Sequence, residues 1–116
     1  MDDRRSRPRL RVSLDAVWER TGDAPPTRIT NLSDGGCFLD TVGEVRQGEI
    51  VAFRVLMPDE DWLYLEGEVR HFVRGIGFGV QFVDLNDEQQ EKVRELIRLA
   101  KQSGPGSRLT GDLVQD

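Results

Sequence analysis

Short stretches of alternating apolar and polar residues run along most of the chain, and glycine or proline interrupts them. The first stretch, RLRVSLDAVWER, places Leu10, Val12 and Leu14 on one face and polar residues on the other. A period of two is typical of a β-strand with one buried face. The pattern predicts a strand from about residue 10 to residue 20.

Five further segments are expected to form strands, because each is rich in β-branched or aromatic residues and ends near a turn-forming residue. They are TRITNL (27–32), GCFLDT (36–41), IVAFRVLMP (50–58), WLYLEGEVRHFV (62–73) and GIGFGVQFV (75–83). Gly67, inside the fifth strand of the series, predicts a bend or a bulge there.

The last periodic segment, NDEQQEKVRELIRLAKQ, has a different spacing. Apolar residues recur at i, i+3, i+4 and i+7 from Val93 to Ala100, which predicts an amphipathic helix. Asn86 can cap its N-terminus, and Gln89 completes an approximate capping box. Six strands followed by one helix indicate an all-β barrel or sandwich. We expect a six-stranded antiparallel β-barrel with a C-terminal α-helix that covers one end.

Composition is compatible with one soluble globular domain. The chain has 116 residues, of which 37% are hydrophobic and 32% charged, and no apolar run approaches the roughly 18 residues of a membrane span. The N-terminus lacks the apolar stretch of a secretory signal, and the single cysteine favours a reducing compartment, so a cytoplasmic location is expected. We expect three parts: a mobile arginine-rich segment (1–9), the barrel with its helix (10–101) and a flexible Gly/Ser/Pro-containing tail (102–116).

Positive charge is concentrated at one end of an acidic chain. The net charge is −5, yet five arginines fall within eight residues: Arg4, Arg5, Arg7, Arg9 and Arg11. A genome of high GC content explains an excess of arginine equally well. An acidic body argues against broad nucleic-acid binding, whereas one arginine-rich segment suits a small anionic ligand. We expect neither nucleic acid nor a membrane as a partner.

The residues that usually carry catalysis or hold metals are few. His71 is the only histidine and is expected to be a partly buried strand residue, and Cys37 a small buried hydrophobe. One cysteine and one histidine are too few for a zinc site, and the acidic run at residues 59–61 fits a solvated hairpin loop. The GIGFG stretch fails the phosphate-loop and dinucleotide fingerprints and fits a turn. We therefore expect no enzyme, no metal and no cofactor.

Two stretches carry the ligand-binding hypothesis. Arg5 and Arg9 precede the first strand, and their guanidinium groups can fork onto phosphate oxygens or a guanine edge. In NLSDGG, Asn31 and Ser33 alternate in an extended stretch and are expected on one face, while Gly36 leaves room for a ligand to approach the backbone. Taken alone, the arginine segment also fits a basic tail without a ligand, and NLSDGG also fits a plain turn.

Together, Arg5-x-x-x-Arg9 and, after 21 intervening residues, Asn31-x-Ser33-x-x-Gly36 resemble the two-part signature of PilZ domains. The family pattern is Arg-x-x-x-Arg, a gap of some tens of residues, and Asp/Asn-x-Ser-x-x-Gly. The resemblance extends over about residues 4–100, since GFGVQFVDLNDEQQEKVRELI is similar to the last strand and closing helix of the family. Arg7-x-x-x-Arg11 has the same spacing, but we prefer Arg5 and Arg9 because Pro8-Arg9 leads directly into the strand.

The resemblance implies binding of cyclic di-GMP, a bacterial second messenger, on the outside of the barrel. It assigns phosphates and guanines to Arg5 and Arg9, a guanine and a nearby phosphate to Asn31 and Ser33, and the shape of the turn to Gly36. An arginine just before the motif, here Arg4, is associated in the family with a stacked ligand dimer.

Without an output domain, such a receptor would signal through an effector protein, by ordering of its arginine segment. The alternative is a PilZ-fold adaptor for motility or pilus assembly that binds no nucleotide.

Overall fold

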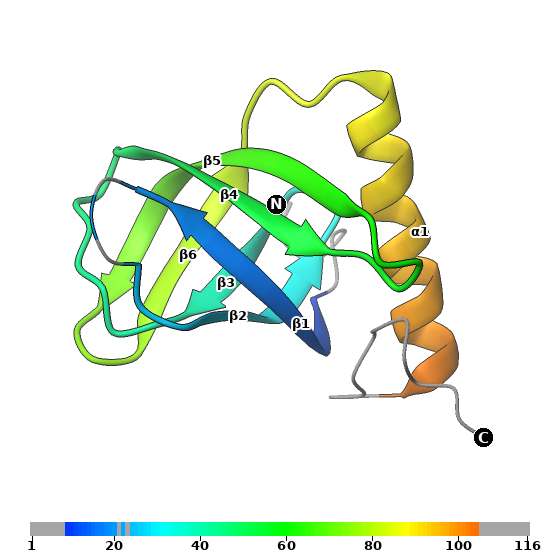
Figure 1. Ribbon diagram of the computed structural model, residues 1–116, viewed down its shortest axis with the longest axis horizontal. Coiled ribbons are helices and arrows are strands. Elements are labelled where there is room, and N and C mark those ends of the chain that lie inside the picture. Colours follow the sequence, from blue (N-terminus) through cyan, green and yellow to red (C-terminus); the bar gives the residue numbers. More distant parts are fainter. Residues whose placement is uncertain (1–8, 21, 23, 105–116) are drawn as a thin grey trace, which may run out of the picture.

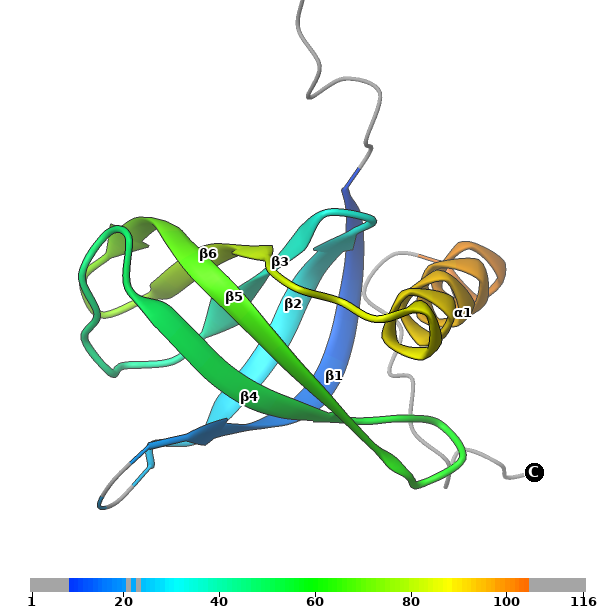
Figure 2. The ribbon, with the colours of Figure 1, turned by 90° about the horizontal axis from the view of Figure 1, so that it is seen from above.

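The computed structural model describes residues 9–20, 22 and 24–104, which form a closed barrel and one helix (Figure 1). The helix, α1 (Asp87–Ser103), lies beside one end of the barrel (Figure 2). This confirms the predicted fold. The strands are β1 (Leu10–Glu19), β2 (Thr27–Ser33), β3 (Gly36–Asp40), β4 (Ile50–Leu56), β5 (Trp62–Val73) and β6 (Gly77–Phe82).

The expected ends of the chain are covered only in part. Residues 1–8 of the predicted arginine-rich segment and residues 105–116 of the predicted tail lie outside the described residues. The helix continues to Ser103, past the predicted boundary at residue 101, and Gly104 caps it by donating its backbone N–H to the Ala100 carbonyl.

Two three-stranded meanders make up the barrel. Strands β1, β2 and β3 pair in chain order, and so do β4, β5 and β6. Antiparallel pairing of β1 with β4 and of β3 with β6 joins the two meanders. Because every strand then has two neighbours, the barrel has no exposed strand edge.

The contact between β3 and β6 depends on glycine. A Cβ atom on Gly36 would collide with the carbonyl oxygen of Val80, and one on Gly77 would collide with that of Leu39. These two glycines, one on each strand, allow the backbones of the two meanders to approach closely.

Apolar side chains from all six strands fill the barrel, among them the fully buried Leu14, Phe53 and Phe78. The helix adds Val93, Leu96 and Ala100 to this core. The predicted capping box is confirmed: Asn86 Oδ1 accepts from the Gln89 backbone N–H at 2.7 Å, and Gln89 Oε1 accepts from the Asn86 backbone N–H at 2.8 Å.

The bulge predicted at Gly67 lies instead at Arg70. Gly67 pairs in register with Phe82, and the β5–β6 register shifts only between Val69 and His71. Gly67 has a packing role, because a Cβ there would lie 2.6 Å from Val80 Cγ2. A glycine in a strand can thus indicate a close side-chain contact rather than a bulge.

In the part of the chain that the structure describes, no helix is long and apolar enough to cross a bilayer. The same residues contain no group of three or more potential metal-ligating side chains.

Replacement of Leu96 by alanine tests the docking of the helix. Leu96 is buried against the barrel, whereas Leu99 on the same helix is only half-buried. We expect Leu96→Ala to lower the free energy of unfolding by about 2–5 kcal/mol because it leaves a cavity. The matched Leu99→Ala variant is expected to lose less than about 1 kcal/mol in urea denaturation. Equal losses would contradict packing through the Leu96 face.

Candidate ligand-binding site

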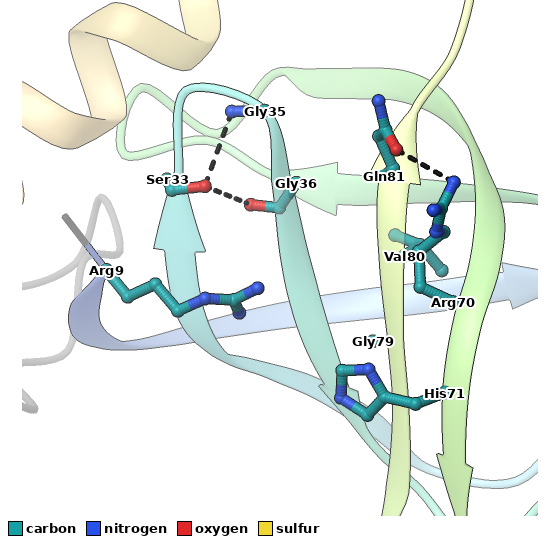
Figure 3. Close-up of a pocket in the computed structure, with 9 residues that line it drawn as sticks. All are labelled: Arg9, Ser33, Gly35, Gly36, Arg70, His71, Gly79, Val80 and Gln81. Carbon is teal, nitrogen blue, oxygen red and sulfur yellow. Dashed lines mark hydrogen bonds between the residues drawn. The ribbon is translucent and has the colours of Figure 1, made fainter. Parts of the chain in front are cut away.

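A pocket of about 370 Å³ opens on the outer face of the barrel, beside the β2–β3 turn and the neighbouring parts of β5 and β6 (Figure 3). This volume lies within the range of roughly 300–1,000 Å³ that is usual for small-molecule sites. The lining residues are Arg9, Ser33, Gly35, Gly36, Arg70, His71, Gly79, Val80 and Gln81.

The start of β1 brings the two halves of the predicted motif together. Arg9 directly precedes β1, and its Nη1 donates a hydrogen bond of 3.4 Å to Oδ1 of Asn31 on β2. Arg11 pairs opposite Asn31 in the β1–β2 ladder and is exposed, but it does not line the pocket, whereas Arg9 does. Arg4 and Arg5 lie outside the described residues.

Ser33 is buried at the end of β2 and closes the β2–β3 turn. Its Oγ accepts a hydrogen bond from the Gly35 backbone N–H at 3.3 Å and donates to the Gly36 carbonyl oxygen at 3.4 Å. These contacts hold the hydroxyl at the pocket wall. Asn31, two residues earlier, is half-buried. It does not line the pocket itself but accepts a hydrogen bond from Arg9, which does.

Gly36 lines the pocket, but the packing of β3 against β6 is what requires glycine at this position. Its φ angle lies outside the left-handed region, and the space that a Cβ would need is occupied by the Val80 carbonyl. Gly36 is therefore required for the β3–β6 contact, whether or not a ligand also approaches its backbone.

Sequence reasoning missed the β5 and β6 side of the pocket. The expectation that His71 is partly buried is wrong, because its side chain is exposed and lines the site. Strict alternation would send the adjacent Arg70 and His71 to opposite faces, but the bulge at Arg70 turns both outward. No residue in the local sequence indicated this shift, and the expected signal, Gly67, was three positions away.

The lining of the pocket is cationic. Its described lining residues include two arginines and no carboxylate, and in the same part of the chain neither Arg9 nor Arg70 forms an ion pair. Elsewhere on the barrel, arginines such as Arg28, Arg54 and Arg74 each contact a carboxylate. The site therefore offers two guanidinium groups that can bind an anion without first breaking an ion pair.

Cys37 does not contribute reactive chemistry to the site. It is fully buried on β3, and this burial raises the pKa of its thiol well above the usual range, although the positive charge of Arg9 opposes the shift. A neutral, enclosed thiol is a poor nucleophile, so the expectation of a small buried hydrophobe is confirmed.

A family model described as PilZ domain matches residues 3–99. The chain belongs to the PilZ domain family. Its barrel and terminal helix also agree with solved PilZ structures, so the fold expected from the resemblance is confirmed.

The similar structures share the fold at low sequence identity. The PilZ domain of YcgR from Escherichia coli, solved with c-di-GMP, is 14% identical with a TM-score of 0.71, over 86% of this chain and 93% of that one. The inhibitor of motility MotI/DgrA from Bacillus subtilis is 19% identical with a TM-score of 0.71, over 87% of this chain and 53% of that one.

A YcgR structure in complex with c-di-GMP from Escherichia coli is 14% identical with a TM-score of 0.70, over 85% of this chain and 46% of that one. This PilZ domain therefore spans about half the length of the MotI/DgrA chain and of the longer YcgR chain. Comparison with curated protein sequences gives no match.

Two glycine substitutions in this PilZ domain test whether the β3–β6 backbone contact is rigid. Gly36→Ala places a methyl group against the Val80 carbonyl, which is backbone and cannot move aside, so we expect a loss of about 1–3 kcal/mol in stability. Gly79→Ala meets the His71 ring at 2.6 Å instead, and that ring can rotate away. Thermal denaturation should show the larger loss for Gly36→Ala, and the opposite order would contradict a rigid β3–β6 contact.

Proposed function

We propose that this PilZ domain is a receptor for cyclic di-GMP. The observation that carries the proposal is the hydrogen bond from Arg9 to Asn31, which joins the two halves of the motif at the edge of a cationic pocket. Ser33 lies in the same pocket. The two YcgR structures of similar fold were solved with c-di-GMP, which supports the choice of ligand.

The chemistry of the pocket suits this ligand. Cyclic di-GMP carries two phosphates and two guanines, and a guanidinium group can fork onto phosphate oxygens or onto the O6 and N7 atoms of guanine. In the proposal Arg9 holds a phosphate, while Asn31 and the Ser33 hydroxyl contact a guanine or a nearby phosphate. Gly36 contributes by keeping β3 close to β6, and no metal or cofactor takes part.

Arg4 and Arg5 complete the proposed site from the N-terminal side. The PilZ match includes both residues, and Arg5 stands four positions before Arg9 in the motif. We infer that ligand binding fixes this N-terminal segment against the β2–β3 end of the barrel. A partner protein would then recognise the surface formed by the ligand, the N-terminal segment and the barrel. The domain would thus signal through ordering of this segment and partner binding, without catalysis.

Calorimetric titration tests the proposal directly. We expect cyclic di-GMP to bind, and GMP and cyclic di-AMP to bind more weakly. Arg9→Ala should weaken binding of cyclic di-GMP about 10-fold or more, because it removes a charge-assisted contact. The matched control is Arg98→Ala on the exposed side of α1, where Arg98 contacts Glu95 at 2.7 Å. Absence of heat with cyclic di-GMP and folded protein would contradict the proposal.

The stoichiometry of the same titration addresses Arg4. If Arg4 supports a stacked ligand dimer, the unaltered chain should bind about two molecules per chain and Arg4→Ala about one. An unchanged value in Arg4→Ala would remove Arg4 from the proposed site.

A second candidate function is the docking of a partner protein without nucleotide. The exposed aromatic residues on the outer face of β4 and β5 favour it. Trp62 and Tyr64 are exposed there, with 40% and 56% of the residue surface accessible, and the Arg54 guanidinium lies 4.6 Å from the Trp62 ring centroid. Tryptophan, tyrosine and arginine are enriched in the energetically dominant parts of protein interfaces. Capture of one partner equally with and without cyclic di-GMP would favour this function over the receptor.

A further inference from the structure

Three residues lie in line across neighbouring strands beside the pocket. Gly79 on β6 pairs with Phe38 on β3 at one side and with His71 on β5 at the other. Because Gly79 has no side chain, the two rings meet above its backbone, with centroids 6.0 Å apart and an angle of 30° between their planes. The position of the imidazole is therefore set by contacts from two other strands.

The His71 ring has little freedom to move toward β6. A Cβ atom on Gly79 would lie 2.6 Å from its Cε1, so the ring rests directly over the glycine. Across the pocket, the side chain of Arg9 points toward His71 (Figure 3). An exposed, oriented aromatic ring opposite a guanidinium group is suited to stacking on a planar base.

Arg70 is oriented by its neighbour on β6. Its Nη1 donates a hydrogen bond of 3.1 Å to Oε1 of Gln81, and both side chains are exposed on the pocket side of the sheet (Figure 3). Guanidinium groups bind the O6 and N7 atoms of guanine in a bidentate manner, whereas adenine presents an amino group in place of O6. An arginine held in this way can distinguish the two purines.

We propose that the β5 bulge provides a guanine-recognition wall, in which His71 stacks on a base of the ligand and Arg70 binds its O6 and N7 edge. This rests on the proposed function, because cyclic di-GMP is the ligand that would supply the guanine. Gly79 acts as a positioning residue through His71. The wall lies outside the two-part motif and comes from strands that the motif does not include.

Titration of variants with cyclic di-GMP and cyclic di-AMP tests the wall. His71→Ala should weaken binding of cyclic di-GMP about 10-fold, the usual effect of losing one base stack. His71→Phe should stay within about threefold of the unaltered protein, because the planar ring is kept. Gly79→Ala should behave like His71→Ala, since its methyl group displaces the ring.

Arg70→Ala should reduce the preference for cyclic di-GMP over cyclic di-AMP about 10-fold, measured by competition. The matched control is Arg74→Ala in the β5–β6 turn, where Arg74 contacts Glu44 at 2.8 Å and does not line the pocket. Circular dichroism and thermal denaturation establish that each variant is folded.

The outcomes separate the two proposals. If the unaltered protein does not bind cyclic di-GMP, the proposed function fails and the wall fails with it. If the protein binds, and His71→Ala and Arg70→Ala both titrate like Arg74→Ala, the wall alone is wrong. Loss of binding in His71→Ala that His71→Phe does not restore would also overturn the stacking role.

Discussion

The close contact between β3 and β6 is the constraint on which the rest of the structure depends. Each meander forms from strands that are neighbours in the chain, but the barrel closes only where β3 meets β6 and β1 meets β4. At the first of these contacts, Gly36 and Gly77 allow opposing carbonyl groups to approach the positions that a Cβ would fill. The β3–β6 pairing joins strands that are far apart in the chain, and the contacts between them must offset the entropy lost on loop closure. A steric conflict at this contact would therefore act on the whole fold.

The candidate site is built on this same contact. Ser33 and Gly36 come from the first meander, while Arg70, His71 and Gln81 come from the second. The two sets share a pocket only because the meanders are joined beside them. Because Gly79 has no side chain, the rings of Phe38 and His71 on the two neighbouring strands can contact each other above it. Fold and site thus both depend on glycines of the β3–β6 strand pair.

The positive charge of the pocket contrasts with the negative net charge of the chain. The chain has a net charge of −5, and several arginines outside the pocket contact carboxylates. In the described part of the pocket, Arg9 and Arg70 instead contact the amide oxygens of Asn31 and Gln81. An amide orients a guanidinium group but leaves its charge uncompensated, which favours the binding of an anion.

Much of the fold could be predicted from the sequence. A strand or a helix with one buried face must place apolar residues at regular intervals, as β1 does by alternation and the helix does from Val93 to Ala100. The paired motif also predicted that Arg9 and Asn31 share a site. The sequence could not locate the bulge at Arg70, since a register shift depends on how β5 pairs with β6. Only the tertiary structure therefore placed His71 outside and beside Phe38, because that contact joins three strands and requires the absence of a side chain at Gly79.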